Sequence, residues 1–104
     1  MKGRRQVIVA PRAAGQLDRI VRWWQANRAE APDLFADELT AALTRLAENP
    51  SAGVPYPLAP RPDVRRILLP RTRYHVYYVT AEAGGRVVVV LAIWHAARGG
   101  RPRL

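Results

Sequence analysis

The sequence predicts a single α+β domain over residues 1–104, with an N-terminal strand and a helical hairpin packed on a mainly antiparallel sheet of about four strands. In the first half of the chain, apolar residues recur at the spacing of an α-helix. In the second half, short runs of β-branched and aromatic residues are separated by brief connections. The change falls in a proline-rich stretch, residues 49–62, and 104 residues leave room for only one core.

The first half begins with a short predicted strand, residues 6–10, which Pro11 ends because its fixed φ and missing N–H suit the first turn of a helix. Trp23 lies beside the apolar stripe of that helix, which consists of Leu17, Ile20, Val21 and Trp24. Residues 27–31 interrupt the pattern, and Pro32 can open a second helix. We expect this second helix to end before Pro50, and its apolar stripe consists of Phe35, Leu39, Ala42, Leu43 and Leu46.

Three strands are predicted in the second half, at residues 64–69, 74–80 and 86–94. The connections between them are too short for parallel crossovers, so the strands form an antiparallel meander. Residues 87–93 are apolar on both faces, which is typical of an interior strand. One helical hairpin cannot cover both faces of such a sheet, so we expect an open face that serves as a site or a partner-binding surface.

Charge and composition limit the classes of partner and cofactor. The net charge is +9, and residues 59–104 hold nine cations against two acids, which favours a polyanion or an acidic protein as partner. The absence of Cys excludes disulfides and cysteine nucleophiles, and two His alone make a metal site improbable. We therefore expect no metal and no cofactor. No apolar run is long enough to span a membrane, and we expect a cytoplasmic protein that binds no membrane.

Four local patterns, taken in order, resemble the RelE/ParE superfamily of bacterial toxins from type II toxin–antitoxin pairs. They are VIVAPRAAGQLDRIVRWW, ALTRLAENPSAGVPYPL, DVRRILLPRTRYHVYYV and VLAIWHAARGGRPRL, and the resemblance extends along the chain from about Gln6 to Arg103. The most specific markers are Pro50 with Gly53, Arg65 with Arg66, Tyr74 with Tyr78, and the group Trp94, His95 and Arg98. The resemblance implies a RelE/ParE-like fold and a toxin that is neutralised by the C-terminal segment of an antitoxin.

The resemblance leaves two activities open. In the ribonuclease branch, which cleaves mRNA on the ribosome, the nominated catalytic residues would be His95 as acid or base, Arg66 and Arg73 on phosphate, and Tyr77 stacking or donating a proton. His95 can equally be a structural residue at the end of a buried strand. We expect Tyr74 and Tyr78 to share the core face with Val76 and Tyr77 to be exposed on the other face.

The ParE-like branch inhibits DNA gyrase by protein contact and has no known catalytic set. This sequence has one Lys, and the meander lacks carboxylates apart from Asp63 and Glu82, which favours the ParE-like branch over the RelE-like endonuclease. A related fold without toxicity is a third possibility. The predicted antitoxin segment is acidic and apolar, and the residues expected to bind the antitoxin or the target are Arg66, Arg73, Arg98 and Trp94.

Overall fold

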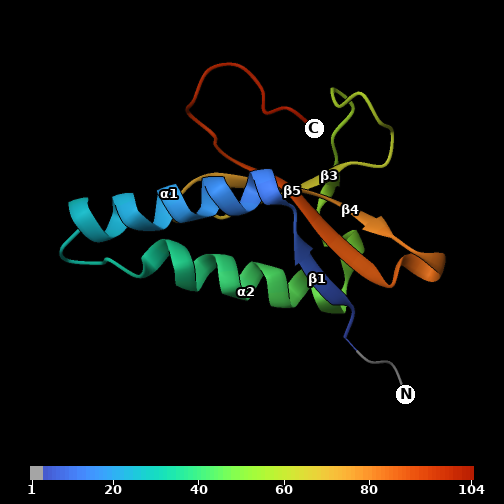
Figure 1. The fold of residues 1–104 in the computed structure, drawn as a ribbon, viewed down its shortest axis with the longest axis horizontal. Helices are drawn as coiled ribbons and strands as arrows, with labels where there is room; N and C mark the ends of the chain where they lie inside the picture. Colours follow the sequence, from blue (N-terminus) through green and yellow to red (C-terminus); the bar gives the residue numbers. More distant parts are fainter. Residues whose placement is uncertain (1–3) are drawn as a thin grey trace.

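Two helices lie on one face of a five-stranded mixed sheet in the computed structural model, which describes residues 4–104 (Figure 1). The helices are α1 (Pro11–Asn27) and α2 (Leu34–Glu48). The strands follow the spatial order β1 (Gln6–Val9), β5 (Val87–His95), β4 (Tyr74–Ala81), β3 (Arg65–Leu68) and β2 (Val54–Pro55). β1 is parallel to β5, and the other neighbours are antiparallel.

The predicted α+β class, the helical hairpin and the three-stranded meander are confirmed. The expected number of strands was one short, because β2 adds two residues beside β3. A two-residue strand that includes a proline is too short to show an alternating pattern in the sequence. β5 is interior as expected, since it pairs with β1 on one side and with β4 on the other.

The main core lies between the two helices and one face of the sheet. Pro11 occupies the first turn of α1, and Ala13 below it is completely buried. Large fully buried side chains of this core include Phe35, Leu46, Val76, Tyr78, Val88 and Val90. The stripes predicted for both helices pack against this cluster. Neither helix within residues 4–104 is long and apolar enough to cross a membrane.

The second face of the sheet carries its own smaller core, so the expectation of an uncovered face was wrong in part. Tyr56, Val64, Tyr77, Val79 and Ala92 are buried there, with Leu104 packed against them. The cover comes from the proline-rich loop and the C-terminal tail, in which Pro102 is also buried. Irregular segments shield this face, and they are not among the helices on which the expectation of an open face rested.

A β-bulge in β5 changes which side chains share a face. Tyr77 is opposite Ala92, but Tyr78 is opposite Val90, so Leu91 is an extra residue in the ladder. Leu91 and Ala92 therefore both belong to the second face. Strict alternation along the sequence would place Leu91 on the same face as Ile93 and His95, and this expectation is wrong because the bulge shifts the alternation by one residue.

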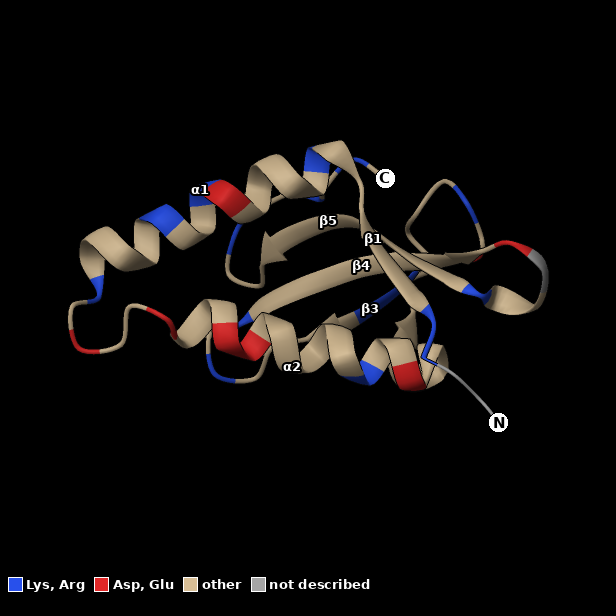
Figure 2. Ribbon diagram, turned by 60° about the horizontal axis from the view of Figure 1, so that its bottom comes forward, with Lys and Arg blue, Asp and Glu red and all other residues tan. Residues whose placement is uncertain are grey.

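Charge is distributed unevenly over these elements. Six of the eight acids lie in the segment from α1 to the end of α2, as Figure 2 shows. The charged residues of β3, β4, β5 and their connections are mainly arginines. The meander is therefore more positive than the segment that holds the two helices.

Candidate functional site

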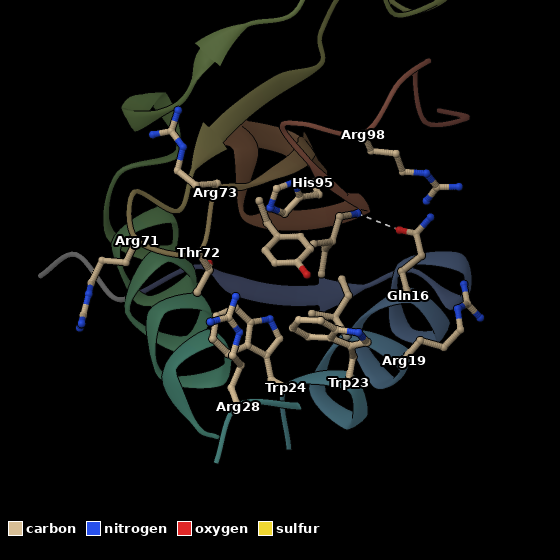
Figure 3. A pocket seen from close by; sticks show the side chains of 13 residues that line it. Gln16, Arg19, Trp23, Trp24, Arg28, Arg71, Thr72, Arg73, His95 and Arg98 are labelled. Atoms are coloured by element: carbon tan, nitrogen blue, oxygen red, sulfur yellow. Dashed lines mark hydrogen bonds between the residues drawn. The ribbon is translucent and has the colours of Figure 1, made fainter. Parts of the chain in front are cut away.

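Two recesses meet at the C-terminal end of β5, one on each face of the sheet. The larger, which we name the helix-side recess, has a volume of about 640 Å³ and lies between α1, the turn from β3 to β4 and the end of β5 (Figure 3). Its lining consists of Gln16, Arg19, Ile20, Trp23, Trp24, Arg28, Arg71, Thr72, Arg73, Tyr74, Ile93, His95 and Arg98. Five of these side chains are arginines and none is a carboxylate.

The turn between β3 and β4 is held to α2 by the carboxylate of Glu38. Its Oε2 accepts a hydrogen bond from the backbone N–H of Arg71 at 2.7 Å, and its Oε1 accepts from the N–H and hydroxyl of Thr72 at 3.0 and 2.6 Å. Partial burial alone would raise the pKa of Glu38, but these hydrogen bonds and the charge of Arg71 outweigh it and hold the pKa below its ordinary value. This contact presents the arginines of the turn to the recess.

Arg73 has a left-handed backbone, with φ of +68°. This conformation is costly for a residue with a side chain and persists where surrounding contacts determine it. Here the Arg73 N–H donates to the carbonyl of Leu69, and the Arg73 carbonyl accepts from the N–H of Ala96, both at 2.8 Å. The second bond ties the turn to the segment that follows β5.

His95 and Arg98 line both recesses. The His95 ring packs edge to face on Tyr74, with centroids 4.8 Å apart, and its Nδ1 accepts a hydrogen bond from the N–H of Ala97 at 3.1 Å. The Arg98 guanidinium lies 3.8 Å from the centroid of the Trp94 ring, a cation–π contact. Both side chains are therefore positioned by aromatic neighbours.

The smaller recess, which we name the far-face recess, has a volume of about 280 Å³. Arg66 donates to the hydroxyl of Tyr77 at 3.2 Å, and its guanidinium lies 5.1 Å from the centroid of the Tyr56 ring. The complete lining is Tyr56, Leu58, Arg66, His75, Tyr77, Trp94, His95, Ala96, Arg98, Gly100 and Arg101. Burial, with the charges of Arg66 and Arg73, lowers the pKa of His75. These surroundings therefore favour the neutral form of His75.

The nominated site residues divide between the two recesses. Arg66, Tyr77 and His95 line the far-face recess, whereas Arg73 lines the helix-side recess. The expectation that Tyr77 is exposed was wrong: it is 3% exposed, because Tyr56 from the proline-rich loop packs edge to face on its ring.

The four residues expected to bind an antitoxin or target also lie around the end of β5 without sharing one surface. Arg66 and Trp94 face the far-face recess, Arg73 faces the helix-side recess, and Arg98 touches both. Arg65, the neighbour of Arg66, points elsewhere and donates to the carbonyl of Gly53 at 2.7 Å. Of this arginine pair, therefore, only Arg66 lines one of the two recesses.

Sequence reasoning missed the α1 wall of the helix-side recess. Gln16, Arg19 and Trp23 follow one another at spacings of three and four residues, parallel to the core stripe. This second stripe was a usable signal, since such spacing places side chains on one helix face. Arg71 carried no such signal, because its place in the recess depends on a contact between the turn and α2.

Within residues 4–104, no group of three or more His, Cys, Asp or Glu side chains is arranged to hold a metal ion. The recesses offer cationic, aromatic and imidazole groups instead. These groups can bind anions and stack on planar or apolar groups.

Comparison with known proteins assigns the family. Among solved structures, the chromosomal ParDE toxin–antitoxin system from P. aeruginosa is similar, with a TM-score of 0.67 and 18% identity, over 88% of this chain and 95% of that chain. An E. coli RelE toxin with two arginines replaced by alanine, in the free state, gives 0.58 and 20%, over 91% and 86%. The isolated E. coli RelE toxin gives 0.58 and 21%, over 91% and 87%.

At such low identities these structures show the likeness of the fold alone. No curated protein sequence matches the chain significantly. The family model for the ParE toxin of the type II toxin–antitoxin system parDE matches residues 7–99, which is most of the chain. The chain therefore belongs to the ParE toxin family of type II toxin–antitoxin systems.

Proposed function

We propose that this toxin acts in the cytoplasm by binding DNA gyrase and inhibiting it through protein contact. The observation that carries the proposal is that the four residues nominated for a ribonuclease do not all line one recess. Metal-independent RNA cleavage requires a base, an acid and cations around one phosphate. Arg73 opens into one recess and Arg66 into the other, and Tyr77 is buried. Family membership agrees with the ParE-like activity.

The alternative function is a RelE-like ribosome-dependent mRNA endonuclease that acts at the far-face recess. It is favoured by one observation: His95, Arg66 and Arg98 line a single cavity, beside the aromatic ring of Tyr56. An imidazole could move the proton while the two guanidinium groups hold phosphate. In this alternative, Arg73 lies outside the catalytic set.

A cognate antitoxin with an acidic and apolar C-terminal segment is the proposed neutralising partner. Its carboxylates would meet arginines of a chain that carries a net charge of +9. Association steered by charge is fast and weakens with salt, and apolar contacts account for the affinity that persists at high salt.

Induced expression without antitoxin tests the proposed function. We expect growth arrest with intact transcripts, together with inhibition of gyrase supercoiling by the purified toxin. A His95→Gln variant should still inhibit supercoiling, because His95 is nominated only for the endonuclease alternative, and exposed Arg12→Gln is the control. Cleaved transcripts with unaffected supercoiling would establish the endonuclease instead. Normal growth and unaffected supercoiling would indicate a related fold without toxicity.

A further inference from the structure

The far-face recess offers positive charge and hydrogen-bond donors without any carboxylate. Three arginines line it, Arg66, Arg98 and Arg101, and none of its lining residues is Asp or Glu. The ion pairs found within residues 4–104 join other arginines to carboxylates, and none of these three takes part. Their charge is therefore available for an anionic ligand.

The aromatic rings of this recess are already covered. The guanidinium of Arg98 lies 3.8 Å from the centroid of the Trp94 ring. That of Arg66 lies 5.1 Å from the Tyr56 centroid and 5.9 Å from the Tyr77 centroid. The two tyrosines are only 6% and 3% exposed. A guanidinium that faces a ring still presents N–H groups at its edge to an oxyanion, so the recess suits the phosphates of a ligand better than its rings.

Two ring N–H groups add to the donors of the recess. The buried indole N–H of Trp94 has no acceptor among the described residues. The Nδ1 of His95 accepts the N–H of Ala97, so in the neutral ring the proton is on Nε2, which is a donor. The volume of about 280 Å³ is at the small end for a ligand pocket, which suits a single phosphate unit.

Positive charge continues beyond the recess along the C-terminal tail. Arg103 lines the adjacent cavity, which shares Tyr56, Leu58 and Arg101 with the far-face recess. Arg98 and Arg103 are five residues apart in the sequence, which is at most ~17 Å of chain. One strand of B-DNA presents about five phosphates over that length. A row of phosphates therefore matches this surface better than one isolated anion.

Duplex DNA fits these features better than a single strand does. Proteins that bind single strands stack the bases on open aromatic faces. Here the rings are buried or covered by guanidinium groups. A duplex keeps its bases paired and presents its phosphates to arginine without requiring such faces.

We propose that the far-face recess and the arginines of the tail bind the phosphate backbone of duplex DNA without reading its sequence, so that the toxin engages gyrase together with the DNA that the enzyme holds. The contacts are Arg66, Arg98, Arg101 and Arg103, with the N–H of Trp94 as a further donor. The part that concerns gyrase rests on the proposed function, whereas DNA binding can be measured without gyrase.

Fluorescence anisotropy of a labelled twenty-base-pair duplex, titrated with the full toxin at several salt concentrations, tests the arginines. We expect combined Arg66→Gln, Arg98→Gln and Arg101→Gln to weaken binding about tenfold to a hundredfold at low salt. The slope of log affinity against log salt should fall by about 2–3, because each lost phosphate contact removes about 0.9. The Arg98→Gln, Arg101→Gln double variant changes exposed side chains only and should show about two thirds of this fall in slope.

The matched control removes the same net charge from exposed arginines of the two helices: Arg12, Arg22 and Arg45. It separates a site from the general effect of net charge, and we expect it to keep most of the wild-type slope. Equal loss of affinity and slope in both triple variants would overturn the proposal.

Competition with the labelled duplex tests the class of ligand. The competitors are the unlabelled duplex, a twenty-nucleotide oligothymidylate and a polyglutamate peptide of equal charge. We expect the duplex to displace the probe most efficiently. Stronger displacement by the oligothymidylate would assign the recess to single strands, and stronger displacement by polyglutamate would assign it to an acidic protein. Either result contradicts the proposal.

Gyrase binding with and without DNA separates this inference from the proposed function. The wild-type toxin should bind gyrase that holds a duplex more tightly than gyrase alone, and in the recess triple variant the ratio of the two affinities should approach one. An unchanged ratio in that variant would refute the inference, although gyrase inhibition stands. If the wild-type toxin binds no gyrase in either state, the proposed function fails, whereas the anisotropy comparison still decides whether the recess binds duplex DNA.

Discussion

The hydroxyl of Tyr78 joins β4 to the loop that follows α2. It donates to the carbonyl of Pro50 at 2.6 Å and accepts from the N–H of Gly53 at 2.9 Å. Burial raises the pKa of Tyr78, and the N–H of Gly53 offsets part of this rise. A β-carbon on Gly53 would lie 2.5 Å from that hydroxyl and 2.8 Å from the carbonyl of Arg66. Residue 53 must therefore be glycine for the loop to approach Tyr78 and Arg66 this closely.

Gly53→Ala should lower the free energy of unfolding by about 2–3 kcal/mol, because the added methyl overlaps a buried hydroxyl and a backbone carbonyl. Urea denaturation measures the change. Gly99→Ala is the matched control, since no atom lies within 4 Å of a β-carbon there and the φ is not left-handed. A Gly53→Ala variant as stable as the control would show that the loop can move away from Tyr78.

Tyr78→Phe removes the hydroxyl and leaves the N–H of Gly53 and the carbonyl of Pro50 without this partner. We expect a loss of about 1–3 kcal/mol in the free energy of unfolding, which is the usual cost of leaving buried polar groups unsatisfied. Thermal unfolding followed by circular dichroism measures this loss. Unchanged stability would mean that solvent replaces the hydroxyl at both groups.

His75 should titrate below 6.5, because burial and the charges of Arg66 and Arg73 disfavour its protonated form. The unfolded chain then binds the proton more readily than the folded chain. This residue therefore destabilises the fold as the pH falls through about 6.5, and its effect levels off below the folded-state pKa. Proton NMR titration checks the value, with His75→Gln to assign the signal. A pKa at or above 6.5 would contradict this account of its surroundings.

At the scale of elements, Glu38 connects α2 to the turn that carries Arg71 and Arg73. The carboxylate satisfies two backbone N–H groups and the hydroxyl of Thr72, a residue that is only 4% exposed. Among the described residues, no other side chain of α2 forms a hydrogen bond to this turn. The position of the arginines in the helix-side recess therefore depends on a residue outside it.

Glu38→Gln should lower the free energy of unfolding by about 1–2 kcal/mol at pH 7, because a neutral amide is a weaker acceptor than a carboxylate. The pKa of Glu38 is depressed in the fold, so its stabilisation is present above the unfolded value of about 4.5 and is lost as the pH falls through the folded value. Urea denaturation from pH 7 to pH 3 should show the two proteins converging. Exposed Asp37→Asn on the same helix is the charge-matched control. A constant difference at every pH would refute the role of the charge.

At the scale of the whole molecule, the C-terminal tail covers part of the second face of the sheet, where no helix packs. Pro102 is buried and Leu104 packs on the cluster that contains Tyr56 and Tyr77. Deleting residues 101–104 should lower the free energy of unfolding by about 1–2 kcal/mol, because it exposes apolar surface. Binding of a hydrophobic dye should rise in parallel. A matched Arg101→Gln, Arg103→Gln variant removes only the charge, and an equal effect of both changes would assign the loss to charge.

The sequence by itself determined the α+β class, the helical hairpin, the meander and the concentration of arginine in residues 59–104. These features follow from local periodicity and from short connections, which are properties of neighbouring residues. Local patterns also placed Tyr74 and Tyr78 on the helix side of the sheet, because the bulge lies in β5 opposite them and leaves their own alternation intact.

Only the tertiary structure decided which arginines share a surface. The bulge at Leu91, the capping of the β3–β4 turn by Glu38 and the tail over Tyr56 depend on residues far apart in the chain. None of them produces a repeat that a sequence window can detect. The same contacts buried Tyr77 and separated Arg66 from Arg73, because a sheet has two faces and long-range packing determines what covers each.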